Sequence, residues 1–113
     1  MGVIAGGLIY NSTINNCYTI GEISGYNSNW QSIVGGIVGD AWETASILHS
    51  HSACTVNNVV IESRSWVGGI AGRVTTTTIE NCYSIGDING GYYTGGISGG
   101  LNTHSVMRYC FST

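Results

Sequence analysis

Two histidines and a cysteine near the middle of the chain could bind a metal ion. His49, His51 and Cys54 fall within six residues, and zinc accepts nitrogen and sulfur ligands of these types. Asp40 or Glu43 could complete a tetrahedral shell. No second cluster has the spacing of a structural zinc site, so we expect an expanded polar corner here. The sequence predicts no metal site and no other cofactor.

Hydrolytic chemistry would need a nucleophile beside a base, or two carboxylates across a cleft. The chain has six acids and three histidines, and Glu22 and Asp87 occupy the same position in two similar segments. Side chains at equivalent positions of a repeat are expected to line one solvated outer edge. The sequence therefore predicts a protein that is not an enzyme.

Aromatic residues are better candidates for binding, because they fall at insertions or at junctions between similar segments. Exposed rings can stack on sugars or fill a pocket of a protein partner. The alternative is that the rings fold over the corners of the molecule and cover them. The candidate contacts are Trp30, Trp42, Trp66, Tyr26, Tyr92 and Tyr93.

A short phrase related to Gly-Ile-x-Gly recurs four times, at residues 3–6, 36–39, 69–72 and 96–99. Its isoleucines are 33, 33 and 27 residues apart. Each copy is followed by a segment that contains one cysteine. Such self-similarity is the signature of a repeat protein. The extra residues of the longer copies are expected at corners, between Gly39 and Cys54 and from Tyr26 to Ile33.

Composition and spacing predict that the repeats consist of short strands. The chain has 18 Gly and no Pro, and its many β-branched and aromatic residues disfavour helix. Apolar residues recur at every third position, which suits short strands broken by corners. They are Ile14, Cys17, Ile20 and Ile23, and again Ile79, Cys82, Ile85 and Ile88.

The predicted fold class is all-β: a right-handed parallel β-solenoid, or β-helix, of three to four coils. A regular coil has about 28 residues, the interval between the last two cysteines. Right-handedness follows the usual rule for parallel crossovers. We expect one domain, residues 1–113, with repeats near 2–33, 34–66, 67–93 and 94–113, the last of them incomplete.

Equivalent residues of successive coils should stack as ladders, roughly 4.7–4.9 Å apart. The expected core ladders are Ile4, Ile37, Ile70 and Ile97; Cys17, Cys54, Cys82 and Cys110; and Ile23, Val60 and Ile88. A further ladder is expected from Tyr18, Thr55, Tyr83 and Phe111. One cysteine per repeat predicts four free, buried thiols.

Gly21, Asn58 and Gly86 fall at one position of this alignment. Asn is the commonest residue other than Gly to adopt a positive φ. The sequence therefore predicts a left-handed corner at these three residues.

The phrase Gly-Ile-x-Gly followed by Asn-Cys-Tyr-x-x-Gly-x-Ile-x-Gly resembles the GLUG-motif repeats of bacterial surface proteins. These include adhesins and the non-catalytic repeats of IgA-cleaving metalloproteases. The resemblance is strongest over residues 69–90, good over 4–25, partial over 36–62 and cut short after Gly96. It implies a β-solenoid in an extracellular or cell-surface setting and no defined reaction, because the His-Glu-x-x-His helix of those proteases is absent.

Charge and hydropathy argue against two classes of partner. Only 8% of the residues are charged and the net charge is −3, so the chain has no basic surface for nucleic acid. No apolar run approaches the roughly 18 residues that cross a bilayer, so we expect no membrane insertion.

The first copy starts at its Gly-Ile phrase and the last stops at residues 110–113, so both solenoid ends are expected to be open and uncapped. Identical chains could stack head to tail through Val3, Ile4, Cys110 and Phe111, which would give a filament. The chain could also be an excerpt of a longer surface protein, such as an adhesin stalk. The alternative function is a glycan-binding or protein-binding module that uses the aromatic corners, with a glycan or a host surface as its partner.

Overall fold

The computed structural model describes residues 1–25, 32–58, 64–90 and 92–113. These residues form short strands in four parallel sheets and contain no helix. This confirms the all-β class and the parallel pairing that the sequence predicts. Trp30, Tyr26 and Val60 lie outside the described residues.

The four sheets are numbered here in the order in which the chain first reaches them. Sheet 1 contains β1 (Ala5–Ile9), β5 (Val38–Trp42), β9 (Ala71–Val74) and β14 (Ser98–Leu101). Sheet 2 contains β2 (Thr13–Asn15), β6 (Ser46–Leu48), β10 (Thr78–Glu80) and β15 (Val106–Arg108). Sheet 3 contains β3 (Tyr18–Gly25), β7 (His51–Asn58), β11 (Tyr83–Ser84), β12 (Ile88–Asn89) and β16 (Phe111–Ser112). Sheet 4 contains β4 (Ser32–Gly35), β8 (Ser65–Gly68) and β13 (Tyr93–Gly95).

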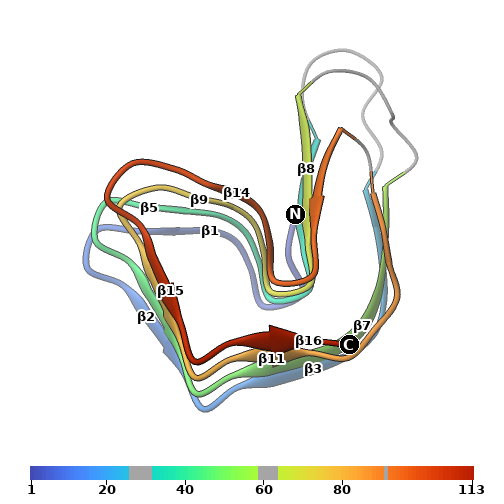
Figure 1. Ribbon diagram of the computed structural model, residues 1–113, viewed down its shortest axis with the longest axis horizontal. Coiled ribbons are helices and arrows are strands. Elements are labelled where there is room, and N and C mark those ends of the chain that lie inside the picture. The colour runs from blue at the N-terminus through green and yellow to red at the C-terminus, as the bar shows by residue number, and fades with distance from the viewer. Residues whose placement is uncertain (26–31, 59–63, 91) are drawn as a thin grey trace.

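Each repeat visits the sheets in the same order, so equivalent strands of successive repeats lie side by side (Figure 1). In sheet 1, Val38 pairs with Ala5 and with Ala71, and Ala71 pairs with Ser98. These partners are 33, 33 and 27 residues apart, the same intervals as those of the Gly-Ile phrase. The repeat in the sequence is therefore the repeat of strand pairing.

The corner between sheets 2 and 3 has left-handed backbone in every repeat, at residues that are not glycine. The φ values are 55° at Asn16, 47° at His49, 54° at Asn81 and 55° at Tyr109. The left-handed corner predicted at Gly21, Asn58 and Gly86 is wrong for the last two, since of these three only Gly21 has a positive φ, 125°. At Gly86 a side chain is excluded instead by close approach, because a Cβ would lie 1.8 Å from the carbonyl oxygen of Cys54.

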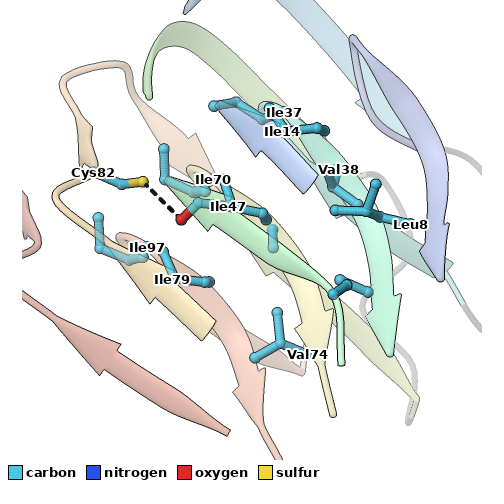
Figure 2. Close-up of a cluster of buried hydrophobic side chains, with 13 residues drawn as sticks. Leu8, Ile14, Ile37, Val38, Ile47, Ile70, Val74, Ile79, Cys82 and Ile97 are labelled. Carbon is cyan, nitrogen blue, oxygen red and sulfur yellow. Dashed lines mark hydrogen bonds between the residues drawn. The ribbon is translucent and has the colours of Figure 1, made fainter. Parts of the chain in front are cut away.

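Buried apolar side chains form two clusters. The larger one lies between sheets 1 and 2 and includes Ile37, Ile47, Ile70 and Ile79, each fully buried (Figure 2). The smaller one lies between sheets 3 and 4 and includes Val34, Cys54, Val56 and Val67. Each fully buried Ile or Val contributes about 1.5–3 kcal/mol relative to an exposed one.

A narrow waist separates the two clusters. The Gly-Gly corner between sheets 4 and 1 bends toward sheet 3 (Figure 1), and a side chain at this corner would meet serine side chains of sheet 3. A Cβ would lie 2.3 Å from Ser52 Oγ at Gly36, 2.1 Å from Ser84 Oγ at Gly69 and 1.8 Å from Ser112 Oγ at Gly96. Each of these glycines lies opposite a serine, and these two small residues together set the distance between the Gly-Gly corner and sheet 3.

Register corrects the predicted cysteine ladder. Cys54 pairs with Gly21, and the place expected for it is taken by Ser50, since His51 pairs with both Tyr18 and Tyr83. Serine fits this position because it makes the same bond. Ser50 Oγ donates to the carbonyl oxygen of Leu48 at 2.7 Å, as Cys82 Sγ donates to that of Glu80 at 3.3 Å.

The second repeat is therefore aligned through Ser50, four residues before Cys54, and three further predictions change with this alignment. Val56, not Val60, pairs with both Ile23 and Ile88. Thr55 leaves the aromatic ladder and pairs with Glu22. No insertion lies between Gly39 and Cys54 relative to the first repeat, because register partners there stay 33 residues apart in sheets 1, 2 and 3.

Candidate functional site

The fold brings charged and aromatic residues of sheets 1 and 4 together. Asp40 and Arg73 are register partners in sheet 1, and Trp66 and Tyr93 are register partners in sheet 4. We call these four residues and Tyr92 the Trp66 cluster. Glycine allows this contact, because a Cβ at Gly100 would lie 2.7 Å from the Trp66 ring.

The cluster is a continuous chain of contacts. Arg73 Nε donates to Asp40 Oδ1 at 3.2 Å, and Arg73 Nη2 donates to Asp40 Oδ2 at 2.5 Å. The Arg73 guanidinium carbon lies 5.0 Å from the Trp66 ring centroid. Trp66 stacks on Tyr93 at 5.4 Å, and Tyr92 meets Tyr93 edge to face at 4.9 Å.

Within this cluster the tyrosines have the most accessible side chains. The Asp40 and Arg73 side chains are only 13% and 25% exposed, whereas Tyr92 and Tyr93 are 63% and 45% exposed. The charged pair and Trp66 join sheets 1 and 4. Tyr92 and Tyr93 are the parts that a ligand could reach.

The other predicted aromatic contacts do not join the cluster. Trp42 is half-buried at the end of β5, where it pairs with Ile9. Trp30 and Tyr26 lie outside the described residues. The sequence prediction also missed Asp40 and Arg73 as a pair. A signal was present, because each directly follows a copy of the Gly-Ile-x-Gly phrase and they carry opposite charges.

A stacked ring column runs along sheet 3. Tyr18, His51, Tyr83 and Phe111 are successive register partners. The ring centroids are 5.3, 4.6 and 5.1 Å apart, with planes within 9° of parallel. Each ring face inside the column is covered by a neighbour, so only ring edges are open along its length.

The metal candidates are not arranged as a site. Burial alternates along β7, which places His51 on the outer face and Cys54 on the inner face. His51 lies within the ring column, and Cys54 belongs to the smaller core cluster. Among the described residues, no group of three or more His, Cys, Asp or Glu side chains could hold a metal ion.

The two carboxylates considered for catalysis lie on one face of sheet 3 with Thr55 between them. Thr55 pairs with Glu22, and the hydrogen bond from Val56 N to the carbonyl oxygen of Asp87 places Asp87 beside Thr55. Glu22 accepts a hydrogen bond from Asn57 Nδ2 at 3.1 Å. Here the carboxylates line a sheet surface and do not face each other.

A thiol and hydroxyl column follows the corner between sheets 2 and 3. In register order it contains Cys17, Ser50, Cys82 and Cys110. All four cysteines of the chain are free thiols; Cys54 and Cys82 are buried, and Cys17 and Cys110 are half-buried. Burial raises the pKa of Cys82 from its ordinary value near 9 to about 11, and the adjacent Cys110 side chain adds to the rise.

The residues predicted for end-to-end assembly lie in the first and last repeats. Val3, Ile4 and Phe111 are 46%, 44% and 56% exposed. Ile4 N donates to the carbonyl oxygen of Ile37, and Phe111 N donates to that of Cys82. In the isoleucine column, Ile37 and Ile70 are fully buried, Ile97 is 8% exposed and Ile4 is its most exposed member.

Comparison with protein families finds the GLUG motif at residues 65–89. This confirms the resemblance recognised in the sequence, over the segment where that resemblance is strongest. No curated protein and no solved structure matches the chain. Within the described residues, no helix is long and apolar enough to span a membrane.

Proposed function

We propose that this chain, with its GLUG motif at residues 65–89, is a right-handed β-solenoid with a structural, non-enzymatic role outside the cell. The main support is the parallel, in-register pairing of equivalent strands in all four sheets. Such a stack is extended by adding coils, and each coil contacts only its neighbours. The extracellular setting rests on the resemblance to surface proteins.

The proposed activity is assembly by coil stacking. The first and last repeats expose apolar side chains, among them Ile4, Leu101 and Phe111. Another coil that continued the same columns would bury them and would pair the free edges of β1 and β14. That coil belongs to an identical chain in a filament subunit, or to a neighbouring repeat in an adhesin stalk.

Negative-stain electron microscopy over a concentration series tests the filament. We expect threads one molecule wide that lengthen with concentration. Phe111→Lys should shorten them, because it places a charge at the stacking face. Ala53→Lys is the matched control, since Ala53 lies on the outer face of β7, which is enclosed by β3 and β11 and is away from both stacking ends. Compact particles at every concentration would exclude self-assembly and leave the stalk.

A second candidate function is binding of a glycan or a protein through the aromatic residues. It is favoured by Tyr92 and Tyr93, which are exposed beside Trp66. Aromatic rings with a few fixed polar groups beside them are typical of small-molecule binding sites, and Tyr and Trp are enriched at interfaces. Titration with glycans should then change tryptophan fluorescence saturably, and Tyr92→Ala should abolish the change. Tyr109→Ala, at a side chain 75% exposed elsewhere, is the control.

A further inference from the structure

Cys82 and Cys110 are adjacent members of the thiol and hydroxyl column. Tyr83 pairs with Phe111 in parallel register, and Phe111 N donates to the carbonyl oxygen of Cys82 at 3.2 Å. Register partners in neighbouring strands have Cα atoms roughly 4.7–4.9 Å apart. A disulfide spans Cα separations of about 4.4–6.8 Å. The backbone therefore already holds this pair at a bridging distance.

The two sulfur atoms are held alike in successive repeats. Cys82 Sγ donates to the carbonyl oxygens of Ile47 and Glu80 at 3.4 and 3.3 Å. Cys110 Sγ donates to those of Ile79 and Arg108 at 3.6 and 3.2 Å. Figure 2 shows the bond between Cys82 and Ile47. A thiol is a weak hydrogen-bond donor, so little is lost when these bonds are exchanged for a covalent one.

No other two cysteines of the chain are register neighbours. Ser50 lies between Cys17 and Cys82 in the column. Cys54 belongs to the core cluster between sheets 3 and 4, whereas Cys82 belongs to the other cluster. Strand register therefore makes Cys110 the cysteine that lies next to Cys82.

We propose that Cys82 and Cys110 are a thiol–disulfide site, at which a small-molecule disulfide reversibly links the third and fourth repeats. The Cys110 thiolate attacks one sulfur of the small disulfide, forms a mixed disulfide and releases one thiol. Cys82 then gives its proton to water and attacks the Cys110 sulfur, which releases the second thiol. Both protein thiols are oxidised, and the small disulfide is reduced to two thiols.

The order of these steps follows from exposure. Cys110 is half-buried and Cys82 is buried, so a reagent from solution reaches Cys110 first. The second step needs no further reagent from solution, because Cys82 already lies beside Cys110. It is slow near neutral pH, because the raised pKa of Cys82, about 11, keeps the thiolate scarce.

Oxidised glutathione tests the site on the full chain at low protein concentration. The number of free thiols, counted in denaturant, should fall from the four of the reduced protein by two. Peptide mapping should find a Cys82–Cys110 link in a monomer, and a reducing thiol should restore all four.

Two variants make the assignment specific. Cys17→Ser should still lose two thiols, whereas Cys82→Ser should lose none to an internal bridge and should keep glutathione on Cys110. Circular dichroism checks that Cys82→Ser is folded, which we expect because Ser50 fills the same position in the second repeat. A glutathione adduct that persists on the unaltered chain at alkaline pH, where the Cys82 thiolate forms, or a bridge between two chains, would overturn the proposal.

Discussion

Several glycines of this protein are required by the close approach of other atoms and not by their own backbone angles. Gly36, Gly69 and Gly96 lie at the waist, where a Cβ would meet a serine side chain. Gly21 is the one described glycine with φ in the left-handed range. Glycine content alone therefore says little about corners, because the waist uses the residue for its lack of volume.

Replacing a waist glycine should destabilise the fold through a steric clash. In Gly69→Ala the new Cβ would lie 2.1 Å from Ser84 Oγ and 2.2 Å from the carbonyl oxygen of Gly96. We expect a loss of about 1–3 kcal/mol in unfolding free energy, as for other overpacked sites. Urea denaturation measures it.

Gly6→Ala is the matched control, because nothing lies within 4 Å of a Cβ at Gly6. Its effect should stay within about 0.5 kcal/mol. Equal losses in the two variants would rule out the clash as the cause.

Cys82 should make stability depend on pH in the alkaline range. Its pKa is raised from an ordinary value near 9 to about 11 in the folded state. The folded state therefore favours the protonated thiol, and this contribution is complete below pH 9 and is lost as pH rises toward 11. Reduced protein should lose stability over this window more steeply than Cys82→Ser. If the unfolding free energies of the two proteins depended on pH in the same way, the raised pKa of Cys82 would be contradicted.

At the scale of elements, columns of side chains tie the repeats and sheets together. The ring column of Tyr18, His51, Tyr83 and Phe111 links the strands of sheet 3. The Trp66 cluster links sheet 1 to sheet 4. Cross-strand pairs of this kind contribute roughly 0.2–1 kcal/mol each, so these columns act as additions to the buried core.

The Asp40–Arg73 pair should couple more strongly than an exposed pair of the same type. It has two hydrogen bonds and little exposure. A double-mutant cycle with Asp40→Asn and Arg73→Gln should give a coupling of about 1–2 kcal/mol. The same cycle on Glu80–Arg108, whose Arg108 side chain is 56% exposed, should give a smaller coupling, because solvent screens exposed ion pairs. A smaller coupling energy for Asp40–Arg73 than for Glu80–Arg108 would show that the less exposed pair does not contribute more to stability.

At the scale of the molecule, four repeats form a thin stack, 19 Å along its shortest axis. The middle repeats supply the fully buried residues, and side chains of the outer two are more open to solvent. A protein built in this way depends on its central repeats, because they join all the others.

A charge in the central column should therefore unfold the molecule. Ile70 is fully buried, and an aspartate there would be an unpaired charge in an apolar cluster. We expect Ile70→Asp to abolish cooperative thermal melting followed by circular dichroism. Ile20→Asp should melt as the unaltered chain does, because Ile20 is 75% exposed. Cooperative melting of Ile70→Asp would contradict the core assignment.

The predictions that failed share a physical origin. Alignment of the cysteines by residue identity predicts Cys54 beside Cys17 and Cys82. Backbone pairing depends on the count of residues between corners, and Ser50 satisfies the same hydrogen bond as a thiol. Aligning Ser50 in the cysteine column would have placed His51 between Tyr18 and Tyr83 and would have shown the ring column.

The sequence by itself determined the strand class, the parallel repeat and the GLUG resemblance, because these follow from residue types and from intervals that the chain carries in one dimension. Only the tertiary structure decided the waist, the contact of Asp40 and Arg73 with Trp66, and the adjacency of Cys82 and Cys110. These contacts depend on where corners bend the chain toward itself. Glycine allows such bends and approaches at many positions, and packing selects among them.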